Sequence, residues 1–209
     1  MANPIEAPSV ERVLKHNKRA WVRHFAARLV FGLCLIASSF ALHIVGVSDS
    51  FLTALPVPLG CFVLLFLIFR TRHGRRLAAC ERVLRIYPLE YRTRVEKKSG
   101  QWLLLGTVFT LKVSTRGQHG APLMRAINAS TVRRWPTGAE NGGAWVAGDL
   151  VFGGVMIVPS THDMLFMQPA DWQKFADARE SADPSRVVRA ERAGLTKLVE
   201  KEPNITYAY

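Results

Sequence analysis

The sequence predicts a membrane α+β protein in which a two-helix transmembrane hairpin is followed by a small antiparallel β-barrel or sandwich, closed by a C-terminal helix. First, residues 29–69 carry a single formal charge, at Asp49, in a chain of 209 residues with a net charge of +12. Second, short apolar or alternating segments separated by turn residues occupy residues 82–170. Third, charged segments with helix-start signals follow residue 170.

The composition excludes two other classes of protein. Hydrophobic residues make up 49% of the chain, which is enough to bury a core and excludes a disordered basic tail. Three cysteines are too few for a disulfide-stabilised scaffold. The net charge by itself fits a nucleic-acid binder or a membrane protein with basic flanks. Its distribution favours the membrane, because residues 1–28 and 70–81 carry net charges of +4 and +3 on either side of the apolar stretch.

Residues 1–28 are predicted to be a basic, amphipathic N-terminal segment in the cytoplasm. Val10, Leu14, Trp21 and Phe25 fall near one face of a helix, and lysines and arginines occupy the other faces. Two arrangements fit this pattern. The helix lies in the lipid headgroup region with Trp21 as an interfacial anchor, or it extends the first transmembrane helix into the cytoplasm.

Residues 29–69 are predicted to be a transmembrane helical hairpin with spans at 29–47 and 51–69. Each span has nineteen residues, and a helix rises about 1.5 Å per residue, so each could cross a hydrocarbon core of roughly 30 Å. Pro56 and Pro58 predict a kink near the outer end of the second span. Because arginines flank the hairpin and no basic residue lies between the spans, the positive-inside rule predicts a two-pass protein of the inner (cytoplasmic) membrane with both termini cytoplasmic.

Two groups of basic residues are candidate contacts for phospholipid or nucleic acid. The first belongs to a basic juxtamembrane linker at residues 70–81, where each cation near the surface attracts anionic headgroups by about 1 kcal/mol. Its members are Arg70, Arg72, Arg75 and Arg76. The second group lies on the strands expected nearest the membrane and comprises Arg92, Arg94, Lys97 and Lys98. The alternative is a solvated basic face beside an anionic membrane.

Residues 82–180 are predicted to be a cytoplasmic β-domain with a closing helix. The expected strands are 81–87, 91–97, 102–113, 123–126, 145–147, 150–152, 155–158 and 164–167, with a turn at Ser99-Gly100. The closing helix begins near Pro169, with Asp171 available as its N-cap. Residues 181–209 are predicted to hold a second helix, over 185–200, and a flexible tail.

The sequence contains no pattern of catalytic or cofactor-binding residues, and we expect a non-enzymatic protein without cofactor or metal. The cysteines lie far apart, and no His or Cys pair has metal-ligand spacing. Ser160, His162 and Asp163 are the residue types of a catalytic triad, but three near neighbours on one turn could hardly converge as a triad requires.

Two segments carry a resemblance to known proteins. The run Ala147–Pro159 and the Gln-Pro-X-X-Trp pattern at 168–172 resemble uncharacterised two-transmembrane-helix membrane proteins of actinobacteria with a cytoplasmic β-domain. The strand series followed by a helix is similar to pleckstrin-homology-like barrels, which is a likeness of fold and does not define function.

The function predicted from the sequence is that of a membrane-anchored binding or scaffold protein, an accessory component of a membrane assembly. Anionic phospholipid and a protein partner are the expected partners, and the chain could oligomerise. One alternative is a membrane protein that assists DNA (plasmid) transfer, although nucleic acid is the less favoured partner. Another is an oligomeric pore or transporter subunit that uses His43, Pro56 and Pro58.

Overall fold

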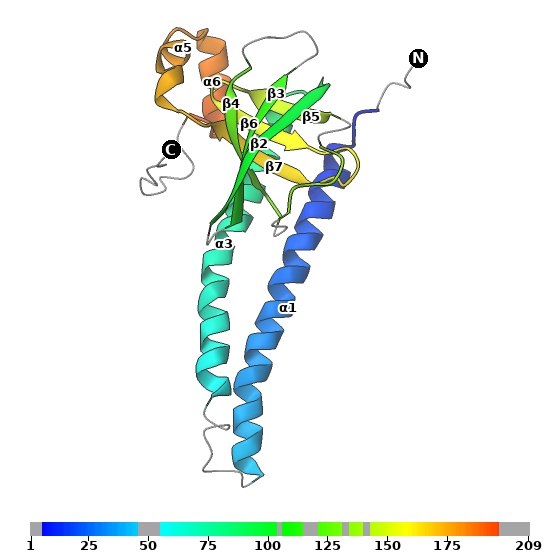
Figure 1. The fold of residues 1–209 in the computed structure, drawn as a ribbon, viewed down its shortest axis with the longest axis vertical. Helices are drawn as coiled ribbons and strands as arrows, with labels where there is room; N and C mark the ends of the chain where they lie inside the picture. Colours follow the sequence, from blue (N-terminus) through cyan, green and yellow to red (C-terminus); the bar gives the residue numbers. More distant parts are fainter. Residues whose placement is uncertain are drawn as a thin grey trace.

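The computed structural model describes residues 6–45, 55–103, 106–114, 121–130, 134–139 and 143–196. Of residues 68–72, 102, 103 and 106 it describes the backbone alone. Two long helices, α1 (Val10–Ile44) and α3 (Pro56–Ile86), lie along each other and carry a curled β-sheet at one end (Figure 1). The long apolar helix and the antiparallel sheet confirm the predicted α+β class.

The sheet has seven strands, and every neighbouring pair is antiparallel. The strands are β1 (Glu90–Arg92), β2 (Arg94–Leu103), β3 (Gly106–Ser114), β4 (Leu123–Asn128), β5 (Ala144–Asp149), β6 (Gly153–Ile157) and β7 (Met164–Pro169). Their order is β1-β5-β6-β7-β4-β3-β2, so β1 and β2 lie at opposite edges although only Thr93 separates them in the chain. The sheet must therefore curl until its edges approach, which produces a half-barrel.

Two hydrophobic cores lie on the two faces of the central strands. Along β6, Val155 and Ile157 face a core shared with the helices, whereas Met156 between them faces a core inside the curl. Strand β7 alternates in the same way, and all residues of β6 and β7 are buried. This alternation follows from strand geometry, because successive side chains point to opposite faces of a sheet.

The core outside the curl joins the β-domain to both long helices. Val13 at the start of α1 and Val83 near the end of α3 are fully buried in it, together with Phe166 of β7. Helix α1 is continuous from residue 10. Its first part is therefore an extension of the apolar helix, which agrees with the predicted arrangement in which the N-terminal helix prolongs the first span.

The C-terminal helices are η1 (Gln173–Phe175), α5 (Ala176–Glu180) and α6 (Pro184–Ala193). Asp171 accepts a hydrogen bond from the Lys174 backbone N–H at 3.1 Å, in the role of a helix cap. The Asp183 carboxylate caps α6 by accepting a hydrogen bond from the Ser185 backbone N–H at 2.8 Å. Helix α6 ends at residue 193, earlier than predicted, because Gly194 takes the left-handed conformation. Residues 197–209, which include the predicted tail, lie outside the described residues.

Several local predictions about the β-domain are wrong, among them the single strand 102–113, which is divided between β2 and β3. Residues 81–87 continue α3, because Cys80, Val83 and Tyr87 follow helical spacing and are buried on one side. The predicted linker 70–81 also belongs to this helix. Ser99 and Gly100 lie within β2, next to a register shift after Lys97, and not in a turn. Residues 150–152 are a turn and not a strand.

Within the described part of the chain, one helix is long and apolar enough to cross a membrane. It is α1, and the apolar part of α3 covers the shorter segment Pro56–Leu67. Proline stands in the first turn of α3, so Pro56 starts the helix rather than kinks it. The predicted second span, the transmembrane hairpin and the topology remain predictions.

Candidate functional site

An apolar belt surrounds the parts of α1 and α3 that lie away from the sheet. In α1, 6% of the most apolar 18-residue segment is buried. Phe31, Phe40 and Ile44 have 56%, 64% and 84% of their surface exposed, and on α3 Phe62 has 57% exposed. A monomeric water-soluble protein rarely exposes a continuous apolar surface of this kind.

The two helices approach each other closely at a pair of glycines. A Cβ atom at Gly60 of α3 would lie 2.8 Å from the backbone carbonyl oxygen of Gly32 of α1, and 2.7 Å from the side chain of Ile36. A Cβ at Gly32 would in turn lie 2.9 Å from Leu64. Small residues at such a crossing let two backbones pack within the apolar belt.

Polar and aromatic contacts fix α1 at its other end. The Asn17 side chain donates hydrogen bonds to the Val13 carbonyl oxygen at 2.9 Å and to the His162 carbonyl oxygen at 2.8 Å. The Trp21 ring lies against Gly74 of α3 and 5.6 Å from the Phe25 ring. The predicted role of Trp21 as an interfacial anchor is untested, and its ring packs between the helices.

The predicted headgroup contacts on α3 divide into different environments. Arg75 is exposed, whereas Arg76 is 3% exposed and is buried beside the core. Arg76 therefore cannot reach lipid in this conformation, because it lies on the α3 face that packs inward. The side chains of Arg70 and Arg72 lie outside the described residues.

The basic residues of the first two strands are largely paired with carboxylates. Arg92 forms an ion pair with Glu90 at 2.6 Å, Lys98 pairs with Glu96, and Arg94 is 3.9 Å from Glu96. These pairs reduce the positive charge that the strands offer to a polyanion.

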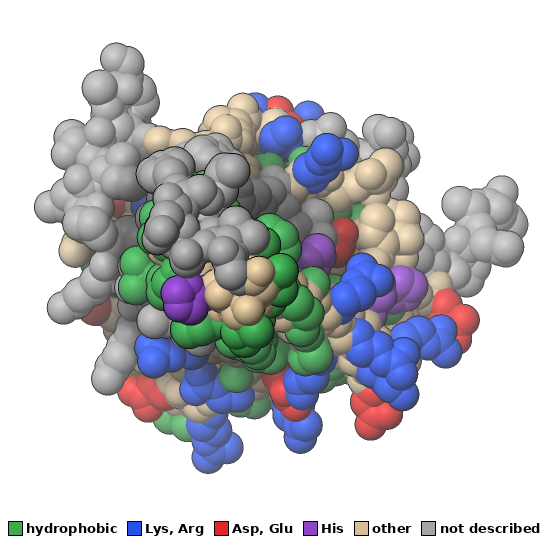
Figure 2. All heavy atoms as spheres, turned by 90° about the horizontal axis from the view of Figure 1, so that it is seen from below, with side chains coloured by type: hydrophobic (Ala, Val, Ile, Leu, Met, Phe, Trp, Pro, Cys, Tyr) green, Lys and Arg blue, Asp and Glu red, His purple; other side chains and the backbone are tan. Residues whose placement is uncertain are grey.

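Lys97, the remaining member of this group, lies over two aromatic rings. Its ammonium nitrogen is 5.8 Å from the centre of the Phe109 ring and 5.6 Å from the centre of the Trp135 ring. Seen from the far ends of the helices, Lys and Arg side chains lie beside the apolar helices, mostly on one side of them and with Asp and Glu side chains among them (Figure 2).

In the turn between β6 and β7, the hydroxyls of Ser160 and Thr161 bond to backbone groups. The Ser160 hydroxyl donates to the Thr137 carbonyl oxygen at 2.7 Å, and the Asp163 backbone N–H donates to the Thr161 hydroxyl. Burial raises the pKa of Cys80 to about 12, so this thiol is not a nucleophile near neutral pH. In the described part of the chain, no group of three or more His, Cys, Asp or Glu side chains could hold a metal ion.

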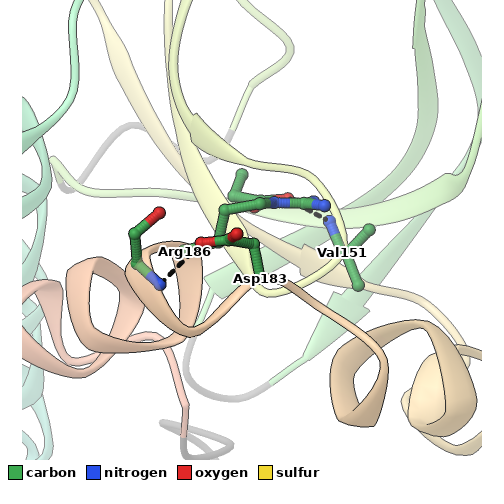
Figure 3. A network of polar contacts seen from close by, with 5 residues as sticks. Val151, Asp183 and Arg186 are labelled. Atoms are coloured by element: carbon green, nitrogen blue, oxygen red, sulfur yellow. Dashed lines mark hydrogen bonds and ion pairs between the residues drawn. The ribbon is translucent and has the colours of Figure 1, made fainter.

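A polar cleft that the sequence did not predict lies where α3, β1, β5 and α6 meet. Its volume is about 310 Å³, and its charged or polar lining includes Tyr87, Glu90, Arg92, Asp149, Arg186 and Arg189. Arg186 of α6 donates two hydrogen bonds to the Asp149 carboxylate, at 2.9 and 3.0 Å. Figure 3 shows the Arg186 side chain reaching toward the turn at Val151. The backbone N–H of Val151 also donates a hydrogen bond to the Asp149 carboxylate, at 3.2 Å.

Comparison of the chain with family models, with curated proteins and with solved structures finds no match in any of the three. The resemblance to actinobacterial membrane proteins and to pleckstrin-homology-like barrels therefore stays a prediction from the sequence.

Proposed function

We propose that the chain is a membrane-anchored binding protein, in which α1 and α3 form a two-pass anchor and the β-domain presents a binding surface to the cytoplasm. In this proposal it acts as a scaffold or accessory component of a membrane assembly and is not an enzyme. The observation that carries the proposal is the apolar belt, which is confined to the ends of the two helices away from the sheet.

The belt supports insertion on energetic grounds. Removing one large apolar side chain from water is worth about 1.5–3 kcal/mol, and the belt exposes several on each helix. At the sheet end of the same helices, Val13, Leu77 and Val83 are buried instead. One end of each helix is thus suited to lipid and the other to a protein core.

The second span is supported by helix packing. The apolar segment Pro56–Leu67 has twelve residues and would alone rise about 18 Å, which is short of a bilayer core. However, its contact with α1 at Gly60 and Gly32 holds both helices at the same depth. Basic residues at the sheet ends of both helices favour a cytoplasmic location for the β-domain.

The β-domain would be held rigidly on this anchor, which supports a scaffold rather than a tethered domain. Both helices continue into the core of the β-domain without a flexible connection. The DNA-transfer alternative is less favoured, because Glu90 and Glu96 neutralise much of the strand charge.

Alkaline carbonate extraction of membranes from cells that express the full chain tests the proposal. We expect the protein to remain in the membrane pellet. Phe40→Arg in α1 and Phe62→Arg in α3, near the centres of the predicted spans, should each move part of the protein to the soluble fraction, since a central arginine costs about 2.5–3.5 kcal/mol on insertion. Val22→Arg is the matched control, because Val22 is exposed on α1 but precedes the predicted span.

Two outcomes would contradict parts of the proposal. Recovery of the wild-type chain in the soluble fraction would overturn membrane anchoring. A shift to the soluble fraction with Phe40→Arg, but none beyond that of Val22→Arg with Phe62→Arg, would overturn the second span and leave a single-pass anchor.

A further inference from the structure

The cleft between α3, β1, β5 and α6 has one more cation than it has carboxylates. Asp149 holds Arg186 in a two-bond contact, and Glu90 holds Arg92. Arg189 lines the same cleft, is exposed, and forms no ion pair with the described residues. Its guanidinium lies 5.8 Å from the centre of the Tyr87 ring. The cleft therefore offers one arginine whose charge is not neutralised.

The Tyr87 hydroxyl is the second feature of the cleft that lacks a partner. Tyr87 is 8% exposed, and its oxygen is buried without a hydrogen bond to any described residue. A buried hydroxyl without a hydrogen-bond partner is unfavourable, because it has lost its bonds to water. Burial, followed by the nearby charge of Asp149, raises the pKa of Tyr87, which keeps the hydroxyl protonated as a donor. A ligand with an acceptor oxygen would satisfy it.

The position of the cleft argues against a lipid headgroup as the source of that oxygen. Tyr87 lies twenty positions after Leu67, the end of the apolar segment, and α3 is continuous from Leu67 to Ile86. A helix of that length rises about 30 Å, which places the cleft well beyond a headgroup layer next to the belt. A ligand would reach it from the aqueous side.

We infer that this cleft binds a small soluble oxyanion, a phosphorylated or carboxylated solute, through the Arg189 guanidinium and the Tyr87 hydroxyl. The bound Asp149–Arg186 pair positions α6 and adds a second guanidinium to the wall. The volume of about 310 Å³ is at the lower end of the range for small-molecule sites. The inference names a class of ligand for the β-domain, which the proposed function describes as a binding domain. Binding of this ligand does not require that the chain is inserted in a membrane.

Isothermal titration of the full chain in neutral detergent with inorganic phosphate tests the inference, with sodium chloride used to keep the ionic strength constant. Arg189→Gln should weaken binding about tenfold, since a charge-assisted hydrogen bond is lost. Tyr87→Phe removes one oxygen and should weaken binding about threefold. Arg192→Gln is the matched control, because Arg192 is an exposed arginine of the same helix that does not line the cleft.

Citrate in place of phosphate distinguishes a carboxylated from a phosphorylated ligand, and nanodiscs with phosphatidic acid test the lipid source. The inference requires that binding of at least one soluble oxyanion is weakened by both cleft variants and not by the control. It is overturned if neither anion binds, if Arg192→Gln weakens binding as much as Arg189→Gln, or if binding requires phosphatidic acid. Because the titration is done in detergent, its failure would leave the carbonate extraction result unaffected.

Discussion

The Asn17 side-chain nitrogen donates a 2.8 Å hydrogen bond to the backbone carbonyl oxygen of His162, which lies 145 positions away in the chain. Asn17 is fully buried, and the same nitrogen also contacts the Val13 carbonyl oxygen within α1. His162 has a positive φ of 58°, in the turn between β6 and β7. The bond therefore couples the start of the long apolar helix to the sheet.

Loss of the hydrogen bond between Asn17 and His162 should destabilise the folded chain, because this bond joins α1 to the sheet. We expect Asn17→Ala to lower the free energy of unfolding by about 1–3 kcal/mol, because it leaves the partly buried His162 carbonyl oxygen without its donor. Chemical denaturation in detergent, followed by tryptophan fluorescence, measures the change. Lys15→Gln, at an exposed position of the same helix, is the control and should have little effect. Equal stability of Asn17→Ala and the wild type would contradict the coupling.

The helix crossing should depend on Gly60. An Ala at this position would place its Cβ against the Gly32 backbone, which cannot rotate away, so Gly60→Ala should destabilise the chain by about 1–3 kcal/mol. Gly74→Ala is the matched control, because its Cβ would make an ordinary 3.4 Å contact with the Trp21 ring. Thermal unfolding in detergent compares the two variants. A larger loss of stability in Gly74→Ala than in Gly60→Ala would show that the closely packed crossing of the helices is not at Gly60.

An ion pair between the two helices should make stability sensitive to acid. Glu81 accepts from Lys18 of α1 at 2.8 Å and from Arg85 at 2.7 Å, and hydrogen bonds from Lys18 and then Arg85 lower the pKa of Glu81 below 4.5. A depressed carboxyl pKa gives stability that is present above the unfolded pKa and is lost as the pH falls through the folded pKa. The pair is partly solvated, so its contribution should stay below about 1 kcal/mol.

Glu81→Gln should therefore remove part of the loss of stability between pH 5 and pH 3. Denaturation curves at both pH values measure it. The control is Glu11→Gln, an exposed carboxylate on α1 without an ion pair in the described residues. An acid sensitivity that Glu81→Gln leaves unchanged would assign the effect to other carboxylates.

Arg186 should hold α6 against the β5–β6 turn. Arg186→Gln breaks both hydrogen bonds to Asp149, and we expect faster hydrogen exchange in residues 184–193 with little change in the sheet. The global cost should be about 1 kcal/mol or less, since nearly half of the Arg186 side chain is exposed. Arg192→Gln, at an exposed position of the same helix, is the control and should leave hydrogen exchange in α6 unchanged. Unchanged exchange in α6 would mean that buried Ala190 and Ala193 hold the helix by themselves.

The sequence predicts the apolar helix and most strands because their signals are local. It fails at residues 81–87, where so short a segment of mixed apolar and charged residues fits a strand as well as one helical turn. The segment is helical because this conformation lets Val83 and Tyr87 pack, together with Leu77, into the core of the β-domain. No local pattern contains that tertiary contact.

The polar cleft could not be predicted for a similar reason. Tyr87, Asp149 and Arg189 come from three separate segments, and only the order of strands in the sheet brings them together. Conversely, Arg76 has the same sequence surroundings as Arg75, yet one is buried and the other exposed. The face of α3 that packs inward depends on α1 and the sheet, and the charge pattern alone cannot define it.

Labelling with a membrane-impermeant maleimide tests the central claim of a two-pass anchor with a cytoplasmic β-domain most directly. Cys34 and Cys61 are exposed and are replaced by Ala, whereas buried Cys80 is retained. One further cysteine is then introduced as Ser50→Cys, in the predicted turn between the two spans, or as Lys98→Cys, on the β-domain. In intact spheroplasts we expect labelling of Ser50→Cys at once and of Lys98→Cys only after permeabilisation. Labelling of Lys98→Cys from outside, or protection of Ser50→Cys until permeabilisation, would contradict the account.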